Sequence, residues 1–510
     1  MSMLRSALTV SGLTLMSRIT GVIRDMLIAR FFGSSEATDA FYVAFRLPNM
    51  LRRLFAEGAF QQAFVPMLAD VQARHDQEGQ KRFLDHVFTV LGFAVFVTSI
   101  LGCLAAPLLV WCIASGLEGR GKDLAVALTQ AMFPYIAFMS LVALVASVLN
   151  TLKHFAIPAA TPILLNLSFI VCTLFLTPYF SEPIWALAVA VIAGGVLQLG
   201  TQWIALARLG ICLRPRSLST SFADRDVRHV MRMMVPALLG VGVAQLSILI
   251  NTNIASHLGA GAVTWLNFAD RLMEFPTALL GVALGTVLLP SLSSAYAQGD
   301  DERYRHLLDH GLRLVVLVGI PASIGLWLMA DGLVAFLFQG KNFTPADVVE
   351  TARGVVGYSV GLMGLIALKI IAPAFYARKD IRTPVKMAMV SLCAVQVLNF
   401  VTVPLWDQAG LALSVGLGSC VNAVGLLVIL YRRQIFAFGA GWGFYLFRVL
   451  LGCAVMGVLL YFVQGYFPWT RLRWVDRAWG VALCVAGAAV SYFAVLFALG
   501  WRLRDIRPAQ

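Results

Sequence analysis

Charged side chains are scarce in this chain of 510 residues. Asp, Glu, Lys and Arg together make up 13% of it, whereas a soluble globular domain carries about 25%. Hydrophobic residues make up 59%, and the mean hydropathy is +0.82. Because a globular surface cannot hide so much apolar side chain, the composition excludes a soluble protein and indicates one that lies in a bilayer.

Motifs of enzymes and metal sites are also missing. The eight cysteines are scattered without CxxC or metal-ligand spacing, so we expect neither a disulfide framework nor a zinc site. The seven histidines form no HExxH motif, and the chain has no Gly-rich phosphate loop and no serine nucleophile elbow. We therefore expect a protein that is not an enzyme and that uses no cofactor.

Acidic residues are fewer than basic ones, 26 against 39, which gives a net charge of +13. In a soluble chain this excess would suggest nucleic-acid binding. Most of these Lys and Arg residues, however, lie in short loops between apolar runs, where they determine membrane topology. We therefore expect no nucleic-acid partner.

Long apolar runs follow one another along the chain. A helix that crosses a bilayer needs about 20 mostly apolar residues. The runs are continuous rather than alternating, which excludes the strands of a membrane barrel. The sequence predicts an all-α integral membrane protein of about 14 transmembrane helices, at residues 7–31, 37–68, 87–117, 124–152, 155–181, 183–207, 233–256, 262–299, 307–330, 346–376, 387–406, 408–431, 449–470 and 478–501.

The loop charges predict the orientation. An even number of helices places both termini on one side of the membrane. When both termini are placed in the cytoplasm, most of the loop Lys and Arg residues also lie on the cytoplasmic side, as the positive-inside rule requires. The first apolar stretch contains Arg18 and Arg24 and precedes no small-residue cleavage site. We interpret it as the first membrane helix rather than as a cleaved signal.

Short motifs recur in the same order at a nearly constant offset of about 224 residues, which indicates an internal duplication. The matching pairs are Leu84-Asp85-His86 with Leu308-Asp309-His310, Val65-Pro66 with Leu289-Pro290, Arg46-Leu47 with Arg271-Leu272, and Thr161-Pro162 with Thr383-Pro384. The offset spans an even number of helices, so the two halves insert in parallel. The pattern predicts two six-helix lobes, 1–220 and 221–440, with a helix pair in 441–510 and a site between the lobes.

Several spans contain charges at membrane depth, each of which costs about 2.5–3.5 kcal/mol on insertion scales. They are Arg18, Arg24 and Asp25 of the first helix; Asp39, Arg46, Arg52, Arg53 and Glu57 of the second; Asp270, Arg271 and Glu274 of the eighth; and Arg353 of the tenth. Such repetition predicts a water-filled cavity. Its surplus of arginine favours an anionic, phosphorylated substrate, because the guanidinium fork matches phosphate oxygens.

Snorkelling and internal ion pairs offer a structural explanation for some of the charged residues within the predicted spans. Arg30, Arg313 and Asp39 fit it, because they lie near the ends of their spans. The deeper arginines do not fit it, and the acids are too few to neutralise all of them.

Three stretches of the first two helices carry a resemblance to a known family. The stretches are Ser17-Arg18-Ile19-Thr20-Gly21-Val22-Ile23-Arg24-Asp25, Thr38-Asp39-Ala40-Phe41, and Arg46-Leu47-Pro48-Asn49 through Arg52-Arg53-Leu54-Phe55-Ala56-Glu57-Gly58-Ala59-Phe60. In these stretches, and over its whole length, the chain resembles the MurJ (MviN) lipid II flippases of the multidrug/oligosaccharidyl-lipid/polysaccharide exporter superfamily.

The resemblance implies a monomer that flips lipid II, an undecaprenyl-diphosphate-linked peptidoglycan precursor, across the bacterial inner membrane by alternating access. Its implied partners are lipid II, membrane lipids and the cell-wall synthesis machinery. It implies that Arg18, Arg24, Arg52 and Arg271 bind the substrate and that the last two helices form a groove for its polyprenyl tail. We expect Glu57 to pair with Arg353 after the diphosphate displaces the acids from the arginines. The remaining cavity charges, which are expected to act in gating, are Asp25, Asp39, Arg53, Glu57, Asp270, Glu274 and Arg353.

Three other functions stay open from the residues alone. A flippase for another polyprenyl-diphosphate-linked polysaccharide would need the same anion site. A drug/cation antiporter of the superfamily would need an acidic cavity, and a polyprenyl-dependent glycosyltransferase would need catalytic residues in sizeable external loops.

The energy source is also open between membrane potential and a coupled cation. Some family members bind sodium through carboxylates on the seventh and eleventh helices. Here the polar side chains of those helices are neutral, so we expect no metal site. They include Gln245, Asn251, Asn253, Gln396, Asn399 and Thr402.

Overall fold

The computed structural model describes the backbone of residues 3–53 and 60–502, and every regular element in these ranges is a helix. Side chains are described there except at 3–8, 62, 235–241, 243–244, 278–287 and 289. The chain forms two compact units, Met1–Thr264 and Trp265–Gln510. The predicted lobe boundaries at 220 and 440 concern membrane topology and stay a prediction.

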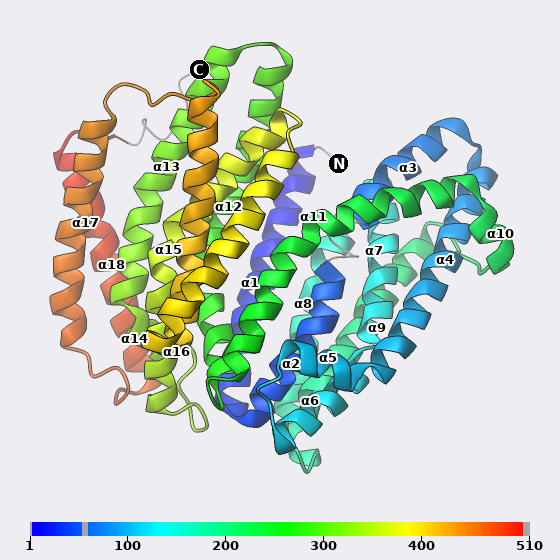
Figure 1. Ribbon diagram of the computed structural model, residues 1–510, viewed down its shortest axis with the longest axis horizontal. Helices are drawn as coiled ribbons and strands as arrows, with labels where there is room; N and C mark the ends of the chain where they lie inside the picture. The colour runs from blue at the N-terminus through cyan, green and yellow to red at the C-terminus, as the bar shows by residue number, and fades with distance from the viewer. Residues whose placement is uncertain (1–2, 54–59, 503–510) are drawn as a thin grey trace. The chain divides into compact units, whose positions relative to one another are not determined.

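The first unit contains the helices up to α11 (Figure 1). They are α1 (Met3–Phe32), α2 (Glu36–Arg52), α3 (Phe60–Arg74), α4 (Gln77–Leu104), α5 (Ala106–Ile113), α6 (Gly119–Met132), α7 (Tyr135–Thr151), α8 (Ala156–Phe175), the 3-10 turn η2 (Thr177–Tyr179), α9 (Trp185–Arg208), α10 (Leu218–Ala223) and α11 (Arg225–Ser256).

The second unit contains most of α12 (Ala262–Ala297) and the helices after it. These are α13 (Asp301–Leu328), α14 (Ala330–Leu337), α15 (Pro345–Ala377), α16 (Arg382–Arg432), α17 (Trp442–Gly465) and α18 (Trp474–Ala498). The last two helices pack against each other and against α13, where the Tyr492 hydroxyl donates to the Leu317 carbonyl at 2.6 Å.

The all-α fold is confirmed, but several predicted spans are interrupted. Pro107 follows the break between α4 and α5, and Pro134 lies between α6 and α7; proline has no N–H to donate within a helix. α16 contains two predicted spans, and its backbone leaves helical geometry at Asp407, where φ is 49°.

Nine helical segments in the described ranges are long and apolar enough to cross a membrane. The full count of about 14 stays a prediction, because the more charged helices do not meet the same criterion. The nine are Gln77–Leu104, Gly119–Thr151, Ala156–Phe175, Trp185–Arg208, Asp301–Leu328, Pro345–Ala377, Arg382–Arg432, Trp442–Gly465 and Trp474–Ala498.

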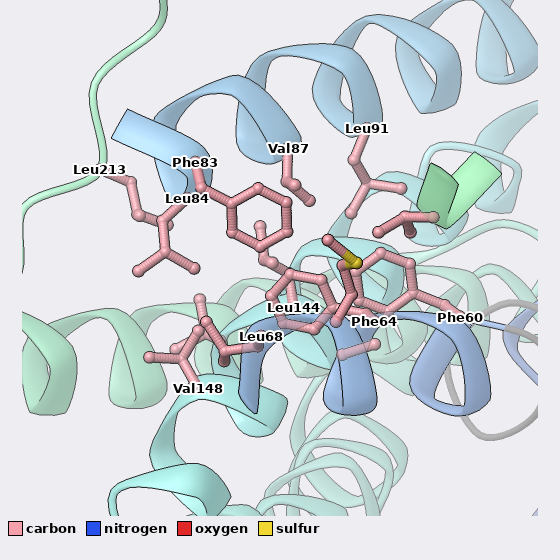
Figure 2. Close-up of a cluster of buried hydrophobic side chains, with 14 of the residues drawn as sticks. Phe60, Phe64, Leu68, Phe83, Leu84, Val87, Leu91, Leu144, Val148 and Leu213 are labelled. Carbon is pink, nitrogen blue, oxygen red and sulfur yellow. The ribbon is translucent and has the colours of Figure 1, made fainter. Parts of the chain in front are cut away.

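An aromatic and aliphatic core fixes α3 in the first unit (Figure 2). The Phe64 ring lies between Phe60 and Phe83, with centroid distances of 4.9 and 6.0 Å. Leu144 and Val148 of α7 close the same cluster from another side (Figure 2). Such side chains gain van der Waals contact with one another when they pack, so α3, α4 and α7 form one packed body.

The repeated Leu-Asp-His triplets make the same contact in both units. Asp85 of α4 accepts a hydrogen bond from the Arg214 N–H at 2.9 Å, in the loop after α9. Asp309 of α13 accepts one from the Gly439 N–H at 3.1 Å, in the loop after α16. Gly439 lies 225 positions after Arg214, so the donor and the acceptor recur at nearly the same offset. This shared contact supports the internal duplication.

Glycines bring α15 and α16 into backbone contact in the second unit. A Cβ atom at Gly361 would overlap the backbone of Gly416, and one at Gly364 would overlap that of Cys420. Small residues permit such close approach between membrane helices, which gain van der Waals contact in return.

We expect Gly361→Ala to reduce the yield of folded protein severely, because the added methyl group would force α15 and α16 apart. The measurement is fluorescence-detected gel filtration of a tagged protein in detergent. Gly325→Ala is the matched control, since a Cβ atom at Gly325 meets nothing within 4 Å. Equal yields of the two variants would contradict this account of the interface.

Candidate substrate site

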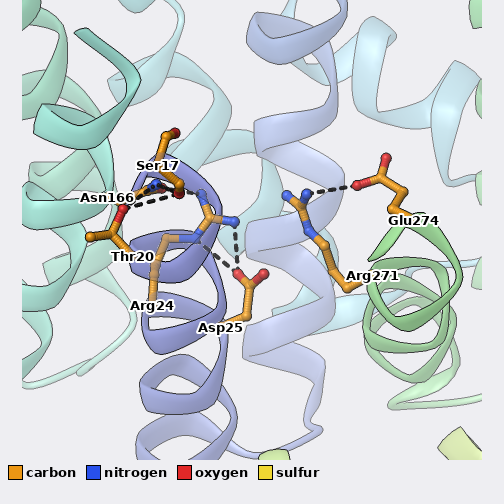
Figure 3. A network of polar contacts seen from close by, with 7 residues as sticks. All are labelled: Ser17, Thr20, Arg24, Asp25, Asn166, Arg271 and Glu274. Atoms are coloured by element: carbon orange, nitrogen blue, oxygen red, sulfur yellow. Dashed lines mark hydrogen bonds and ion pairs between the residues drawn. The ribbon is translucent and has the colours of Figure 1, made fainter. Parts of the chain in front are cut away.

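Arg24, one of the predicted substrate-binding arginines, is bonded through all three of its guanidinium nitrogens (Figure 3). Its Nε and one terminal nitrogen lie 2.9 and 2.7 Å from Asp25 Oδ1, and its other terminal nitrogen donates to Asn166 Oδ1 of α8 at 3.1 Å. The guanidinium also lies 5.3 Å from the centre of the Phe169 ring. The Arg24 side chain is 12% exposed, so it forms a nearly buried, electrically balanced pair with Asp25.

Asn166 fixes the orientation of this pair. Its amide nitrogen donates to the Ser17 carbonyl at 2.9 Å and to the Thr20 hydroxyl at 3.1 Å, both on α1. With its nitrogen held in this way, its oxygen is aimed at Arg24 (Figure 3). Sequence reasoning missed Asn166. The available signal was an isolated amide within the apolar run 155–181.

Arg18 lies six residues before Arg24 on α1 and is partly exposed. No described residue makes a hydrogen bond or an ion pair with its guanidinium. Arg18 is therefore an uncompensated positive charge on the same helix as the Arg24–Asp25 pair, and such a charge attracts anions.

The arginines at the end of α2 have a different setting. The Arg52 Nε and one terminal nitrogen lie 3.2 and 3.1 Å from Asn49 Oδ1. Arg53 is the C-cap residue of α2. Glu57 lies outside the described residues, so its predicted pairs with Arg53 and with Arg353 stay predictions.

Asp39 is almost completely buried and caps the start of another helix. Its carboxylate accepts hydrogen bonds from the Gly261 N–H at 2.6 Å, the Thr264 N–H at 2.8 Å and the Thr264 hydroxyl at 2.5 Å. These N–H groups belong to the beginning of α12, where no intrahelical acceptor exists. The contacts give Asp39 a structural role, in line with its place near a span end, and its part in gating stays a prediction.

In the second unit, Arg271 pairs with Glu274 of the same helix at 3.0 Å (Figure 3). Their side chains are 40% and 43% exposed, so solvent screens the pair and it contributes little to stability. Asp270 precedes this pair and is partly exposed. Arg353 pairs with Glu350 at 3.2 Å, and Glu350 also accepts from Gln408.

The structure thus brings Arg24, Asp25 and Asn166 together in one unit, and pairs Arg271 with Glu274 in the other. Both arginine sets lie on helices, which hold side chains more firmly than loops do. A single cavity that includes Arg18, Arg24, Arg52 and Arg271 stays a prediction from the sequence.

Two of the neutral side chains of the seventh and eleventh predicted helices bond to neighbouring residues. Asn253 donates to the Cys112 carbonyl at 3.2 Å, and the Thr402 hydroxyl lies 2.6 Å from the Ser414 hydroxyl. Among the described residues, no group of three or more His, Cys, Asp or Glu side chains is placed to hold a metal ion.

The chain is similar to several known proteins. The family model "Lipid II flippase MurJ" matches residues 28–475. The lipid II flippase MurJ of Burkholderia cenocepacia is 46% identical over 99% of both chains. A solved structure of lipid II flippase MurJ in an inward closed conformation aligns with a TM-score of 0.78 at 23% identity, over 96% of this chain and 99% of that chain.

A more distant solved structure shares the fold. It is an inward-facing multidrug resistance MATE family transporter of the MOP superfamily, with a TM-score of 0.68 at 12% identity, over 84% of this chain and 98% of that chain. At this identity the likeness concerns the fold alone.

Proposed function

Because this chain belongs to the MurJ family of lipid II flippases, we propose that it moves lipid II from the cytoplasmic to the periplasmic leaflet of the inner membrane. The 46% identity to a lipid II flippase over nearly the whole of both chains carries this proposal. The family is one of transporters rather than enzymes, and its members cross the membrane many times. The shared substrate is a diphosphate-linked lipid, for which arginine is the suitable binding residue.

The Arg24–Asp25 pair supports a specific binding step. Asp25 and Asn166 occupy all three nitrogens of the Arg24 guanidinium, which avoids an unpaired charge at membrane depth. A diphosphate brings more negative charge than Asp25 and replaces it as the acceptor, with Arg18 adding a second cation. The substrate then binds more strongly to the conformation in which Arg24 is released, as a ligand-driven change of state requires.

The remaining parts of the proposal concern topology and coupling. The transporter is a monomer with both termini in the cytoplasm, and it works by alternating access of two lobes. α17 and α18 expose large apolar side chains, including Phe447, Tyr461, Trp479 and Val490, which suits a surface for the polyprenyl tail. Net positive charge in the empty cavity responds to the membrane potential, which returns it toward the negative interior.

Depletion of the protein in its native cell should make lipid II accumulate in the cytoplasmic leaflet within one generation. The measurement is leaflet-resolved labelling of lipid II after rapid proteolytic removal of the tagged protein. Accumulation of a different polyprenyl-linked precursor would assign the protein to that polysaccharide instead. Unchanged distribution of every such precursor would leave the antiporter function as the better explanation.

A further inference from the structure

A cavity of about 720 Å³ opens between α3 and the first turns of α11. The two helices lie side by side in the first unit (Figure 1). Its lining includes none of the arginines that the sequence assigned to substrate binding. The basic residues of this segment contribute to the topology signal of the loops, and the proposed transport does not explain their local arrangement.

Basic side chains dominate the α11 side of this cavity. Arg225, Arg228, His229 and Arg232 all line it, and their spacing of three, four and seven places them on one helix face. Arg74 lines the α3 side. The α11 residues are exposed, so this face is accessible to a ligand from solution or from the membrane surface.

The acids in the lining do not balance these cations. The lining contains four arginines and two aspartates, Asp70 and Asp226. Asp226 already lies 3.6 Å from an Arg74 nitrogen and 3.9 Å from His75 Nε2. The cavity therefore has a net positive charge, and it attracts anions.

Two of the arginines have guanidinium N–H donors that bond to no described residue. Arg228 donates to the Ala223 carbonyl at 2.8 Å, whereas no described residue bonds to the guanidinium of Arg225 or Arg232. Asp224 caps the helix by accepting from the N–H groups of Asp226 and Val227. The binding capacity of the cavity thus resides in its guanidinium forks, which match phosphate oxygens, rather than in free backbone N–H groups.

Exposed apolar side chains accompany the basic ones. Leu218 and Phe222 of α10 are 38% and 37% exposed, and Met231 of α11 is 41% exposed. Apolar side chains beside a basic cluster are typical of a segment that lies at the surface of a membrane with anionic lipids.

We propose that the cavity between α3 and α11 is an accessory site for a phosphate ester. Arg225 and Arg232 donate to the phosphate oxygens, while Arg74 and Arg228 supply further positive charge. The same chemistry is offered by the headgroup of an anionic phospholipid and by a soluble phosphate ester, and the two differ in whether acyl chains strengthen binding.

Titration of the purified full-length protein tests this proposal. Dihexanoyl phosphatidylglycerol and glycerol phosphate are each titrated in neutral detergent, and binding is measured by calorimetry. We expect the combined variant Arg225→Gln/Arg228→Gln/Arg232→Gln to bind at least tenfold more weakly than the wild type. The corresponding lysine variant should keep most of the affinity, since it keeps the charge.

The matched control is Lys81→Gln/Arg303→Gln/Arg382→Gln, which removes three exposed cations outside the cavity lining. Selective binding of the lipid would identify a headgroup site, and equal binding of both probes would identify a soluble phosphate ester. Equal losses in the control and cavity variants, or no loss in either, would overturn the proposal. If the glutamine variant does not fold, as judged by gel filtration, Arg225→Gln alone replaces it and should still weaken binding measurably.

Discussion

Replacement of Arg24 by alanine is expected to abolish lipid II transport while the protein remains folded in the membrane. Arg24 supplies a preorganised fork whose three nitrogens are held by Asp25 and Asn166. Arg24→Lys should still reduce transport by at least roughly tenfold, because an ammonium group replaces a bidentate donor and a charged hydrogen bond contributes about 1.5–3 kcal/mol. The measurements are growth complementation of a depleted strain and leaflet-resolved lipid II labelling.

The alanine variant leaves the buried Asp25 carboxylate without its arginine, which complicates its interpretation. Arg24→Ala/Asp25→Asn removes both charges and should restore the amount of folded protein without restoring transport. Arg120→Ala is the control, because Arg120 is also paired with an acid, Glu182, but is largely exposed. Transport by the double variant at more than half of the wild-type rate would show that the Arg24 pair is purely structural.

Replacement of Asp39 by alanine is expected to lower the melting temperature of the purified protein by far more than the loss of an ordinary helix cap. A helix cap contributes about 1 kcal/mol. Here the change would also leave the buried N–H groups of Gly261 and Thr264 without an acceptor, at about 1–3 kcal/mol for each.

Asp76→Ala provides the comparison, because Asp76 caps α4 through the Gly79 N–H at 2.9 Å at an exposed position. Melting is followed by tryptophan fluorescence in detergent. A shift for Asp39→Ala no larger than that for Asp76→Ala would mean that water satisfies the freed N–H groups.

The all-α membrane fold was predictable from the sequence, because apolar run length depends on composition alone. The break at Asp407 also coincides with the predicted boundary between two spans. Other boundaries differ, since runs such as 87–117 continue through Pro107 without any loss of hydropathy. Hydropathy therefore predicts whether a segment lies in lipid or in water, but it does not predict the residue at which the helical hydrogen bonds stop.

The partners of the site residues were harder to predict. Adjacent residues on a helix do not face each other, yet the long Arg24 side chain folds back to reach Asp25. Asn166 lies 142 positions away from Arg24, and Thr264 lies 225 positions away from Asp39. Periodicity assigns each such residue a face of its own helix, but it carries no information on which distant helix that face contacts.

The matching contacts of Asp85 and Asp309 have a consequence for the ancestry of the chain. If the two halves arose by duplication and fusion, this aspartate held the segment after the last helix of a single-copy ancestor. In the present chain the first contact holds the loop that leads on through α10 to α11, and the second holds the loop that leads to α17. The C-terminal helix pair thus follows the loop that corresponds to the connection between the two halves.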